Sequence, residues 1–98
     1  MWYVYILFCD QKIYYVGITD NIQRRVKQHK NGESFYTKKF SEIRLVYFEN
    51  HNSRKSAEKR ELQLKKWTVA KKEALIKGDI ELLKKLSKGT GVVDDSGR

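Results

Sequence analysis

Tyrosine, arginine and histidine recur near the start of the chain at spacings that can bring them together. Tyr5 lies in one strand-like segment and Tyr15 in the next, with a polar turn between them. Arg25 and His29 follow four residues apart, so they share one side of a helix. A guanidinium and an imidazole that lean toward the tyrosines form a candidate site for an anion.

A single carboxylate, Glu61, belongs with this set. Ala57 and Leu64 mark the apolar stripe of a later helix, and at about 100° per residue Glu61 lies roughly 40° from the first and roughly 60° from the second. A carboxylate beside an apolar stripe needs a partner. An ion pair with Arg25 or Lys65 is the ordinary explanation, and a metal ion is the functional one.

The tyrosines require two strands. Runs of β-branched and aromatic residues predict strands over residues 2–8 and 13–18, joined by a polar hairpin turn. Alternation lets at least one tyrosine of each strand meet across the pair, although tyrosine is a favoured strand residue without any site. Gly17 is less ordinary, because glycine weakens a strand and usually marks a bulge or a close backbone approach.

A third strand is expected over residues 43–48, where simple alternation places Ile43, Leu45 and Tyr47 on one face. Most of the remaining chain has helical spacing. Because strands precede most of the helices, the sequence predicts an α+β fold, in which helices flank a small three-stranded antiparallel sheet in the order β-β-α-β-α-α-α.

Four helices are expected from their capping residues and apolar spacing. The second begins at Ser53 and carries Ala57, Leu64 and Trp67 near one face. Glycine, which adopts the left-handed conformation readily, ends three of the helices. The caps and stops lie at Thr19-Asp20-Asn21 and Asn31-Gly32, at Ser53, at Thr68 and Gly78, and at Asp79 and Gly89.

A length of 98 residues indicates one domain, which we expect over residues 1–87 with a disordered tail over 88–98. Cys9 is the only cysteine, which excludes an internal disulfide and fits a reducing compartment. No apolar run approaches the ~20 residues of a membrane span. We therefore expect a cytoplasmic monomer that does not cross a membrane.

The chain is strongly basic, with 21 Lys and Arg against 12 Asp and Glu and a formal net charge of +9. Such a surface attracts polyanions, of which nucleic acid is the leading candidate. Charge alone fits a phospholipid surface or a ribosomal assembly equally well. It does not identify the partner.

The ordered set of motifs resembles the GIY-YIG nuclease superfamily, in particular its short stand-alone members. Tyr3-Val4-Tyr5 and Tyr15-Val16-Gly17 stand at the two family triplets, and Arg25 follows the second tyrosine by ten residues. His29 occupies the family's His or Tyr position. The segment from Arg60 to Trp67 resembles the one whose glutamate binds metal, and the resemblance covers residues 2 to about 87.

The resemblance implies a metal-dependent endonuclease that hydrolyses phosphodiester bonds, with DNA favoured over RNA and a role in repair or recombination. Glu61 would hold one divalent cation, Mg²⁺ or Mn²⁺. Tyr5, or a water held by it, would serve as the base, and Tyr15 would orient the phosphate or that water. Arg25 would counter charge at phosphorus, and His29 would hydrogen-bond it or relay a proton. An ordinary phenol is a poor base, so this role requires the metal or Arg25 to favour the phenolate.

Two departures from the family pattern bear on substrate choice. Tyr3 replaces the leading glycine of the first triplet, and no appended targeting domain is recognisable. A protein partner is therefore a candidate source of specificity. The rival interpretations are a non-catalytic nucleic-acid-binding module with the same fold and a basic protein-interaction domain. Glu61 discriminates between them, because pure binding of a polyanion gains nothing from a carboxylate in the groove.

Overall fold

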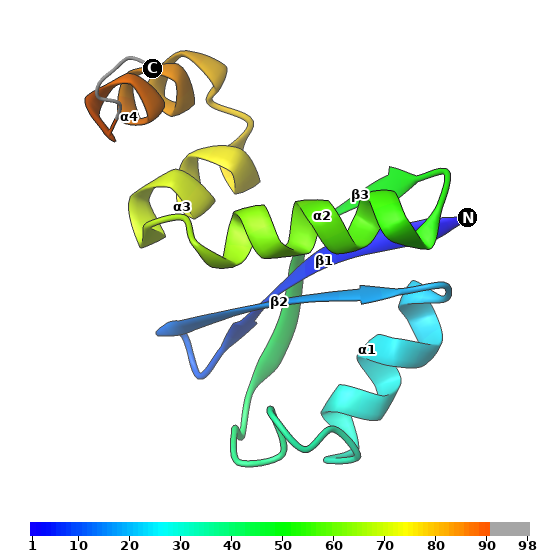
Figure 1. The fold of residues 1–98 in the computed structure, drawn as a ribbon. Coiled ribbons are helices and arrows are strands. Elements are labelled where there is room, and N and C mark those ends of the chain that lie inside the picture. The colour runs from blue at the N-terminus through cyan, green and yellow to red at the C-terminus, as the bar shows by residue number, and fades with distance from the viewer. Residues whose placement is uncertain (91–98) are drawn as a thin grey trace. The chain divides into compact units, whose positions relative to one another are not determined.

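The computed structural model describes residues 1–90, which fall into two compact units. The first, Met1–Lys65, contains a sheet and two helices, and the second begins at Lys66 and contains two more helices (Figure 1). The predicted α+β class and element order are confirmed. The strands are β1 (Trp2–Cys9), β2 (Ile13–Thr19) and β3 (Ile43–His51), and the helices are α1 (Ile22–Lys30), α2 (Arg54–Lys65), α3 (Val69–Lys77) and α4 (Ile80–Thr90).

The three strands form an antiparallel sheet in the order β2-β1-β3, so β2 and β3 are its edges. The expectation of simple alternation along β3 is wrong beyond Leu45. Leu45 pairs with Leu7 whereas Tyr47 pairs with Ile6, which leaves Val46 as an extra residue in a β-bulge. Tyr47 therefore lies on the opposite face of the sheet from Leu45.

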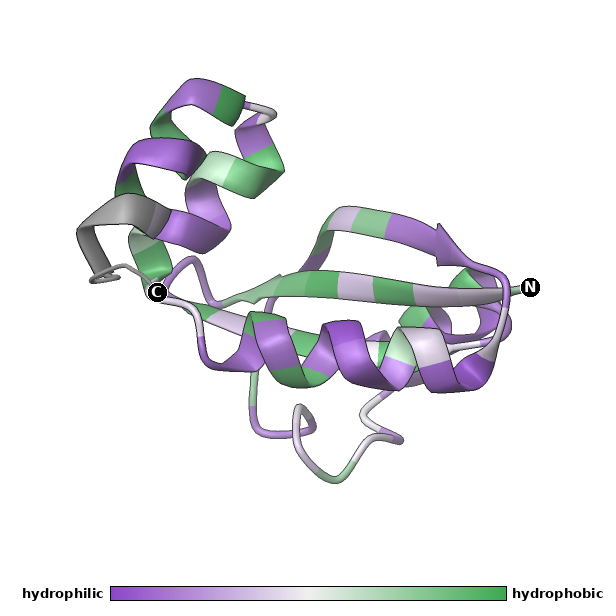
Figure 2. Ribbon diagram, turned by 45° about the horizontal axis from the view of Figure 1, so that its top comes forward, coloured by the Kyte–Doolittle hydropathy of each residue, from purple (hydrophilic) through white to green (hydrophobic). Residues whose placement is uncertain are grey.

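The two faces of the sheet carry different helices (Figure 1). On one face, Tyr5 and its buried neighbours Leu7, Cys9 and Ile43 pack against Ile22 and Val26 of α1. Cys9 is thus a buried packing residue. The other face is covered by α2, whose Ala57 and Leu64 are fully buried. The strands are largely hydrophobic and the helices mix hydrophobic with hydrophilic residues (Figure 2), as a sheet between two amphipathic helices requires.

The N-terminal caps appear where the sequence predicts them, but the stop predicted at Gly89 is wrong, because α4 continues to Thr90. Asn21 caps α1 by accepting a hydrogen bond from the Arg24 backbone N–H, and the Ser53 hydroxyl does the same for Ser56 in α2. Gly32 follows α1 with a φ of +75°. The placement of Trp67 on the second helix is wrong, because α2 ends at Lys65.

The second unit is a helical hairpin. Thr68 caps α3, Gly78 ends it with a φ of +75°, and the Asp79 carboxylate accepts a hydrogen bond from the Leu82 N–H at the start of α4. Ala74 is buried in this unit and Lys71 lies over the ring of Trp67. Of the predicted tail over residues 88–98, residues 91–98 lie outside the described part of the chain.

Candidate functional site

Tyr5 and Gly17 form the centre of the candidate site, because they face each other across β1 and β2. A Cβ atom on residue 17 would lie 2.5 Å from the Tyr5 hydroxyl oxygen and 2.6 Å from its Cζ. The ring of Tyr5 therefore lies directly over Gly17. The close approach expected at Gly17 is real, and it is made by a side chain. Glycine is required there because any side chain would displace the tyrosine.

We predict that Gly17→Ala destabilises the protein by about 1–3 kcal/mol, the usual cost of overpacking a core. The ring of Tyr5 must move to admit the new methyl group. Urea unfolding of the variant and of the Tyr5→Leu/Gly17→Ala double variant measures the effect. Because leucine removes the clash, the alanine should cost less in the double variant. If strand propensity alone mattered, alanine would stabilise the strand relative to glycine. A stabilising Gly17→Ala substitution would therefore contradict this packing.

Tyr5 is joined to His29 through a buried hydrogen bond, with 2.9 Å between the hydroxyl oxygen and Nε2. On the other side of the ring, His29 Nδ1 lies 2.6 Å from the hydroxyl oxygen of Thr37. Both His29 and Thr37 are buried. With the imidazole neutral, Tyr5 donates to Nε2 and the Nδ1–H donates to Thr37. These two hydrogen bonds thus fix the imidazole of α1 between Tyr5 of the strand β1 and Thr37 of the following loop.

The environment keeps both partners of this hydrogen bond neutral. Burial raises the pKa of Tyr5 to about 12, even though a hydrogen bond from Arg25 lowers it. Burial and the nearby Arg25 charge lower the pKa of His29 to about 4. The phenolate form that the base role of Tyr5 requires is therefore disfavoured by the protein alone. At neutral pH the pair is a phenol hydrogen-bonded to a neutral imidazole.

The pKa of His29 predicts a loss of stability in mild acid. Its pKa is 6.5 ordinarily and about 4 in the folded chain, so between these values only the unfolded chain binds the proton. Stability is full above pH 6.5 and falls by up to ~3 kcal/mol as the pH drops toward 4. Urea unfolding at several pH values, with His29→Gln as the comparison, measures this contribution. An equal acid sensitivity of the two proteins contradicts the assignment.

Arg25 lies beside this pair. Its guanidinium hydrogen-bonds the Gln28 side chain at 3.0 Å, and it lowers the pKa values of Tyr5, Tyr15 and His29. The residue is half-buried, whereas its neighbour Arg24 is exposed and pairs with Asp20. The structure thus directs one arginine of the adjacent pair toward the tyrosines.

Tyr15 completes the aromatic part of the site. Its ring centroid lies 6.4 Å from that of Tyr5 and 5.3 Å from that of His29. Burial raises its pKa, and the nearby Arg25 and Lys65 charges lower it. The sequence-based expectation that tyrosines of the two strands meet is confirmed.

Glu61 reaches this group from the helix on the other face of the sheet. Its charge raises the pKa values of both Tyr5 and Tyr15, so it lies within electrostatic range of them. Its carboxylate pairs with Lys65 at 3.3 Å, one of the two ion pairs that the sequence allows. The Glu61 side chain is 20% exposed and that of Lys65 is 49% exposed. The carboxylate is therefore accessible to a ligand from solution.

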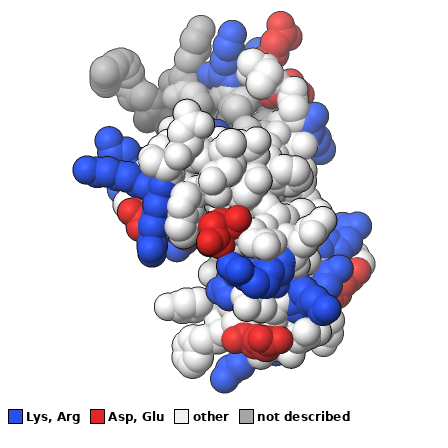
Figure 3. All heavy atoms as spheres, turned by 90° about the vertical axis from the view of Figure 1, so that its right-hand side faces the viewer, with Lys and Arg blue, Asp and Glu red and all other residues white. Residues whose placement is uncertain are grey.

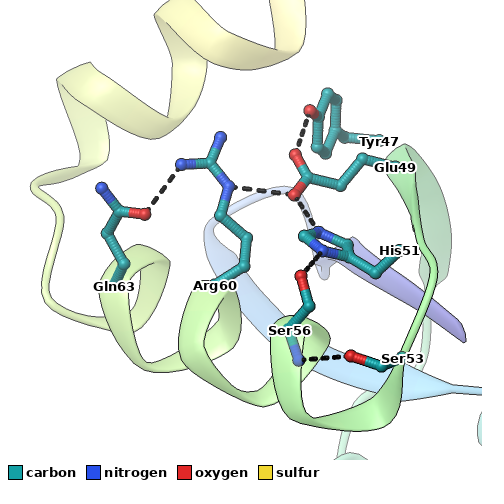
Figure 4. Close-up of polar contacts among 7 residues, drawn as sticks. All are labelled: Tyr47, Glu49, His51, Ser53, Ser56, Arg60 and Gln63. Atoms are coloured by element: carbon teal, nitrogen blue, oxygen red, sulfur yellow. Dashed lines mark hydrogen bonds and ion pairs between the residues drawn. The ribbon is translucent and has the colours of Figure 1, made fainter.

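The orientation of Glu61 is set by the residue before it. Arg60 Nε donates to the Glu49 carboxylate of β3 at 2.9 Å, and the same carboxylate contacts His51 at 2.7 Å (Figure 4). His51 in turn shares a 2.7 Å hydrogen bond with the Ser56 hydroxyl. These contacts join β3 to α2 at two successive helical turns, through Ser56 and Arg60. They fix the orientation of α2 about its own axis relative to the sheet. They exist because the bulge at Val46 places Glu49 and His51 on the α2 face of the sheet.

Burial raises the pKa of Glu49, but hydrogen bonds from Tyr47, His51 and Arg60 outweigh it and hold the pKa below its ordinary 4.5. The stabilisation from this carboxylate is present above pH 4.5 and is lost below it. Glu49 therefore affects the stability mainly at lower pH than His29 does.

The loop between α1 and β3 contributes residues that the sequence reasoning missed. Thr37 binds His29, and the ring of Tyr36 is stacked on that of Tyr15 with 6.4 Å between centroids. Neither residue carries a local signal, because this stretch has no helical or strand period. Only the folded chain brings the loop to the site.

The site combines buried and accessible groups, because Tyr5 and His29 are 1% exposed whereas the Glu61 side chain is 20% and Tyr36 66% exposed. Two grooves of about 560 and 410 Å³ lie beside α1 and share Ile22, Gln23 and Leu45, and the candidate residues Tyr5, Tyr15, Arg25, His29 and Glu61 line neither groove. On the face in Figure 3, Lys and Arg occur in several groups interspersed with Asp and Glu. Within the described residues, no three His, Cys, Asp or Glu side chains gather at one point. Glu61, whose charge acts on both Tyr5 and Tyr15, is the candidate ligand for a metal ion at this site.

None of the helices that the structure describes has the length and apolarity needed to cross a membrane.

Comparison with known proteins decides the family. A family model described as the GIY-YIG catalytic domain matches residues 1–74. The chain belongs to the GIY-YIG family. The resemblance seen in the sequence is therefore confirmed, and the matched residues include both tyrosines, Arg25 and Glu61. A GIY-YIG domain places the chain in a family of nucleases.

Relatives of similar length share this domain. The GIY-YIG chain is 42% identical to a UPF0213 protein of Clostridium perfringens over 76% of this chain and 81% of the relative. It is 42% identical to a UPF0213 protein of Syntrophus aciditrophicus over 81% of this chain and 93% of the relative. A solution NMR structure of a UPF0213 protein from Bacillus halodurans has 35% identity and a TM-score of 0.51, with 79% of this chain and 84% of that chain covered. The similarity thus spans most of each short protein.

Proposed function

We propose that this protein is a metal-dependent endonuclease that hydrolyses phosphodiester bonds in nucleic acid, with DNA favoured over RNA. The observation that carries the proposal is the convergence of Tyr5, Arg25, His29 and Glu61 from three elements around Gly17. A purely structural cluster has no need of a half-buried guanidinium and a carboxylate that act on the same two phenols. The net charge of +9 supports a polyanionic substrate.

The donor set suits a hard divalent cation. Glu61 offers an accessible carboxylate, and Mg²⁺ or Mn²⁺ accepts one such ligand with water and substrate oxygens in the remaining positions. When bound, the cation would supply charge stabilisation at the phosphate and the leaving oxygen. Lys65 would release Glu61 and remain available to a phosphate oxygen. A single carboxylate holds one cation, not two.

The neutral Tyr5–His29 pair gives a route for the proton of the attacking water. As the water oxygen bonds to phosphorus, Tyr5 accepts the water proton and passes its own proton to His29 Nε2. The bond from phosphorus to the leaving sugar oxygen breaks, and that oxygen takes a proton from solvent. The imidazole is neutral at pH 7, so its Nε2 is open to this proton, and the Thr37 contact holds it in that tautomer. Because its pKa is about 4, the imidazolium is short-lived, and the proton returns through Tyr5 to solvent. This route needs no preformed phenolate.

Arg25 and Tyr15 act on the phosphate group itself. The Arg25 guanidinium counters the negative charge that grows on the phosphate oxygens as the water adds. Tyr15, whose raised pKa keeps it protonated, donates a hydrogen bond to a phosphate oxygen or to the water. Both groups lie beside Tyr5, so they meet the same phosphate.

The Glu61–Lys65 ion pair favours a second candidate function, a nucleic-acid-binding module without catalysis. In that case the pair is a surface contact, and the aromatic and basic side chains hold the polyanion without cutting it. This alternative requires no metal, and its partner is still nucleic acid.

Incubation of the pure protein with labelled duplex, branched and single-stranded DNA and RNA tests both candidates. We expect cleavage with Mg²⁺ or Mn²⁺ and none with EDTA. A protein that binds these nucleic acids in a salt-dependent manner and cuts none of them is the binding module. Equal cleavage in EDTA contradicts the role of the metal.

A further inference from the structure

Phe35 and Tyr36 are two adjacent aromatic side chains that the catalytic roles above do not use. They are 76% and 66% exposed, respectively. Their rings lie nearly perpendicular at 89°, with centroids 5.5 Å apart. Single exposed apolar side chains are common, but a pair of this size in one loop beside a candidate active site is not an ordinary solvated surface.

The loop holds the pair in place from both sides. Ser34 and Thr37, which flank the two aromatic residues, are buried. The Ser34 carbonyl accepts hydrogen bonds from the backbone N–H groups of Thr37 and Lys38, and Thr37 is bonded to His29. The two exposed rings therefore project from a turn that is attached to the site. Their exposure is a property of the fold.

The pair is directly next to the reacting groups. Tyr36 is stacked on Tyr15, with an interplanar angle of 26° and 6.4 Å between centroids. Lys38 lies over the Phe35 ring with 5.1 Å between Nζ and the centroid, and Lys39 follows it. An aromatic surface bordered by lysines is the chemistry that holds a nucleotide, with stacking for the base and charge for the phosphate.

We propose that Phe35 and Tyr36 stack on an unpaired base of the nucleic acid next to the phosphate held at Tyr15. In a duplex, neighbouring bases cover the ring faces, so a side chain can stack only on a base that is single-stranded, terminal or displaced from the helix. The aromatic pair thus selects a substrate that is unpaired at the site of cleavage. This inference rests on the proposed function for the role of the phosphate site, while the stacking itself needs only a bound nucleic acid.

Binding measured without cleavage tests the stacking separately. In the Glu61→Gln background and in EDTA, we propose titrating a single-stranded 2-aminopurine-labelled DNA and its duplex with the Phe35→Ala/Tyr36→Ala double variant. Single-strand affinity should fall by about tenfold or more, and the 2-aminopurine quenching should be lost, because these are the effects of removing a stacked base. Duplex affinity should change much less. The Tyr36→Phe variant, which keeps the ring, should bind as the parent does.

Phe48→Ala is the matched control. Phe48 is also an exposed aromatic residue, at 52%, and it contacts Tyr3 from the edge strand β3, across β1 from Tyr15 on β2. It should leave single-strand affinity unchanged. An equal loss of single-strand and duplex affinity in the double variant, no loss in either, or an equal loss in Phe48→Ala overturns the proposal. If the pair stacks selectively on single strands but the protein cuts nothing, this inference stands and the nuclease function is rejected. If the protein cuts in a metal-dependent manner and the pair has no role in binding, the nuclease function stands and this inference is rejected.

Discussion

We expect Glu61→Gln to abolish cleavage at every Mg²⁺ or Mn²⁺ concentration and to leave nucleic-acid binding intact or stronger. Glutamine keeps the shape of the side chain but removes the charge that a divalent cation needs, and it removes one repulsive charge from the phosphate path. Cleavage of a labelled substrate over a range of metal concentrations, together with fluorescence anisotropy for binding, measures both effects.

The same variant should remain folded. Lys65, the partner of Glu61, is 49% exposed, and a pair with this exposure contributes about 0–1 kcal/mol. The loss of about 3–5 kcal/mol that follows from stranding one member of a buried ion pair is not expected here. Glu58→Gln is the control, because Glu58 makes an exposed pair with Arg54 on the same helix. A Glu61→Gln protein that cuts like the parent, or one that unfolds while Glu58→Gln does not, rejects the metal-ligand role.

The second large effect is expected for Arg25→Ala, which should lower the cleavage rate by roughly 10²-fold or more with a smaller loss of binding. The guanidinium counters charge that is greatest in the transition state, so its loss affects the rate more than the ground-state affinity. Single-turnover cleavage and equilibrium binding separate the two quantities.

Arg24→Ala is the natural control, since Arg24 is the adjacent residue and forms an exposed ion pair with Asp20. It should have little effect on cleavage. The Arg25 variant should also raise the pKa of His29, because the Arg25 charge is one of the two causes of its low value. An NMR titration of the imidazole reports this shift. If cleavage and affinity fall by the same factor, Arg25 only docks the substrate.

Local sequence rules predict most of the fold. Caps at Asn21, Ser53, Thr68 and Asp79 mark helix starts because their side-chain oxygens accept the first free N–H groups, a contact that depends only on nearby residues. The ends of strands depend less on nearby residues than the starts of helices do. The β3 strand runs to His51, beyond the expected end, because pairing with β1 continues through polar residues that break the hydrophobic alternation.

The candidate site was predictable only in part. Spacing along a strand or a helix indicates that Tyr5, Tyr15, Arg25 and His29 can face one another, since their elements are regular. The contribution of Thr37 comes from a loop, whose path depends on tertiary contacts. The need for Gly17 also depends on where the Tyr5 ring lies, which no local pattern specifies.

Arg60 and Glu61 are neighbours in sequence with different attachments, and this has a consequence for ligand exchange. Arg60 tethers α2 to Glu49 of the sheet, so the helix does not depend on the Glu61–Lys65 pair for its orientation. Glu61 can exchange Lys65 for another cation by rotating its side chain, with the backbone already in its final position. If Glu61 holds the proposed metal ion, most of the conformational entropy cost of positioning its helix is already met on folding, and we expect the ion to exchange rapidly.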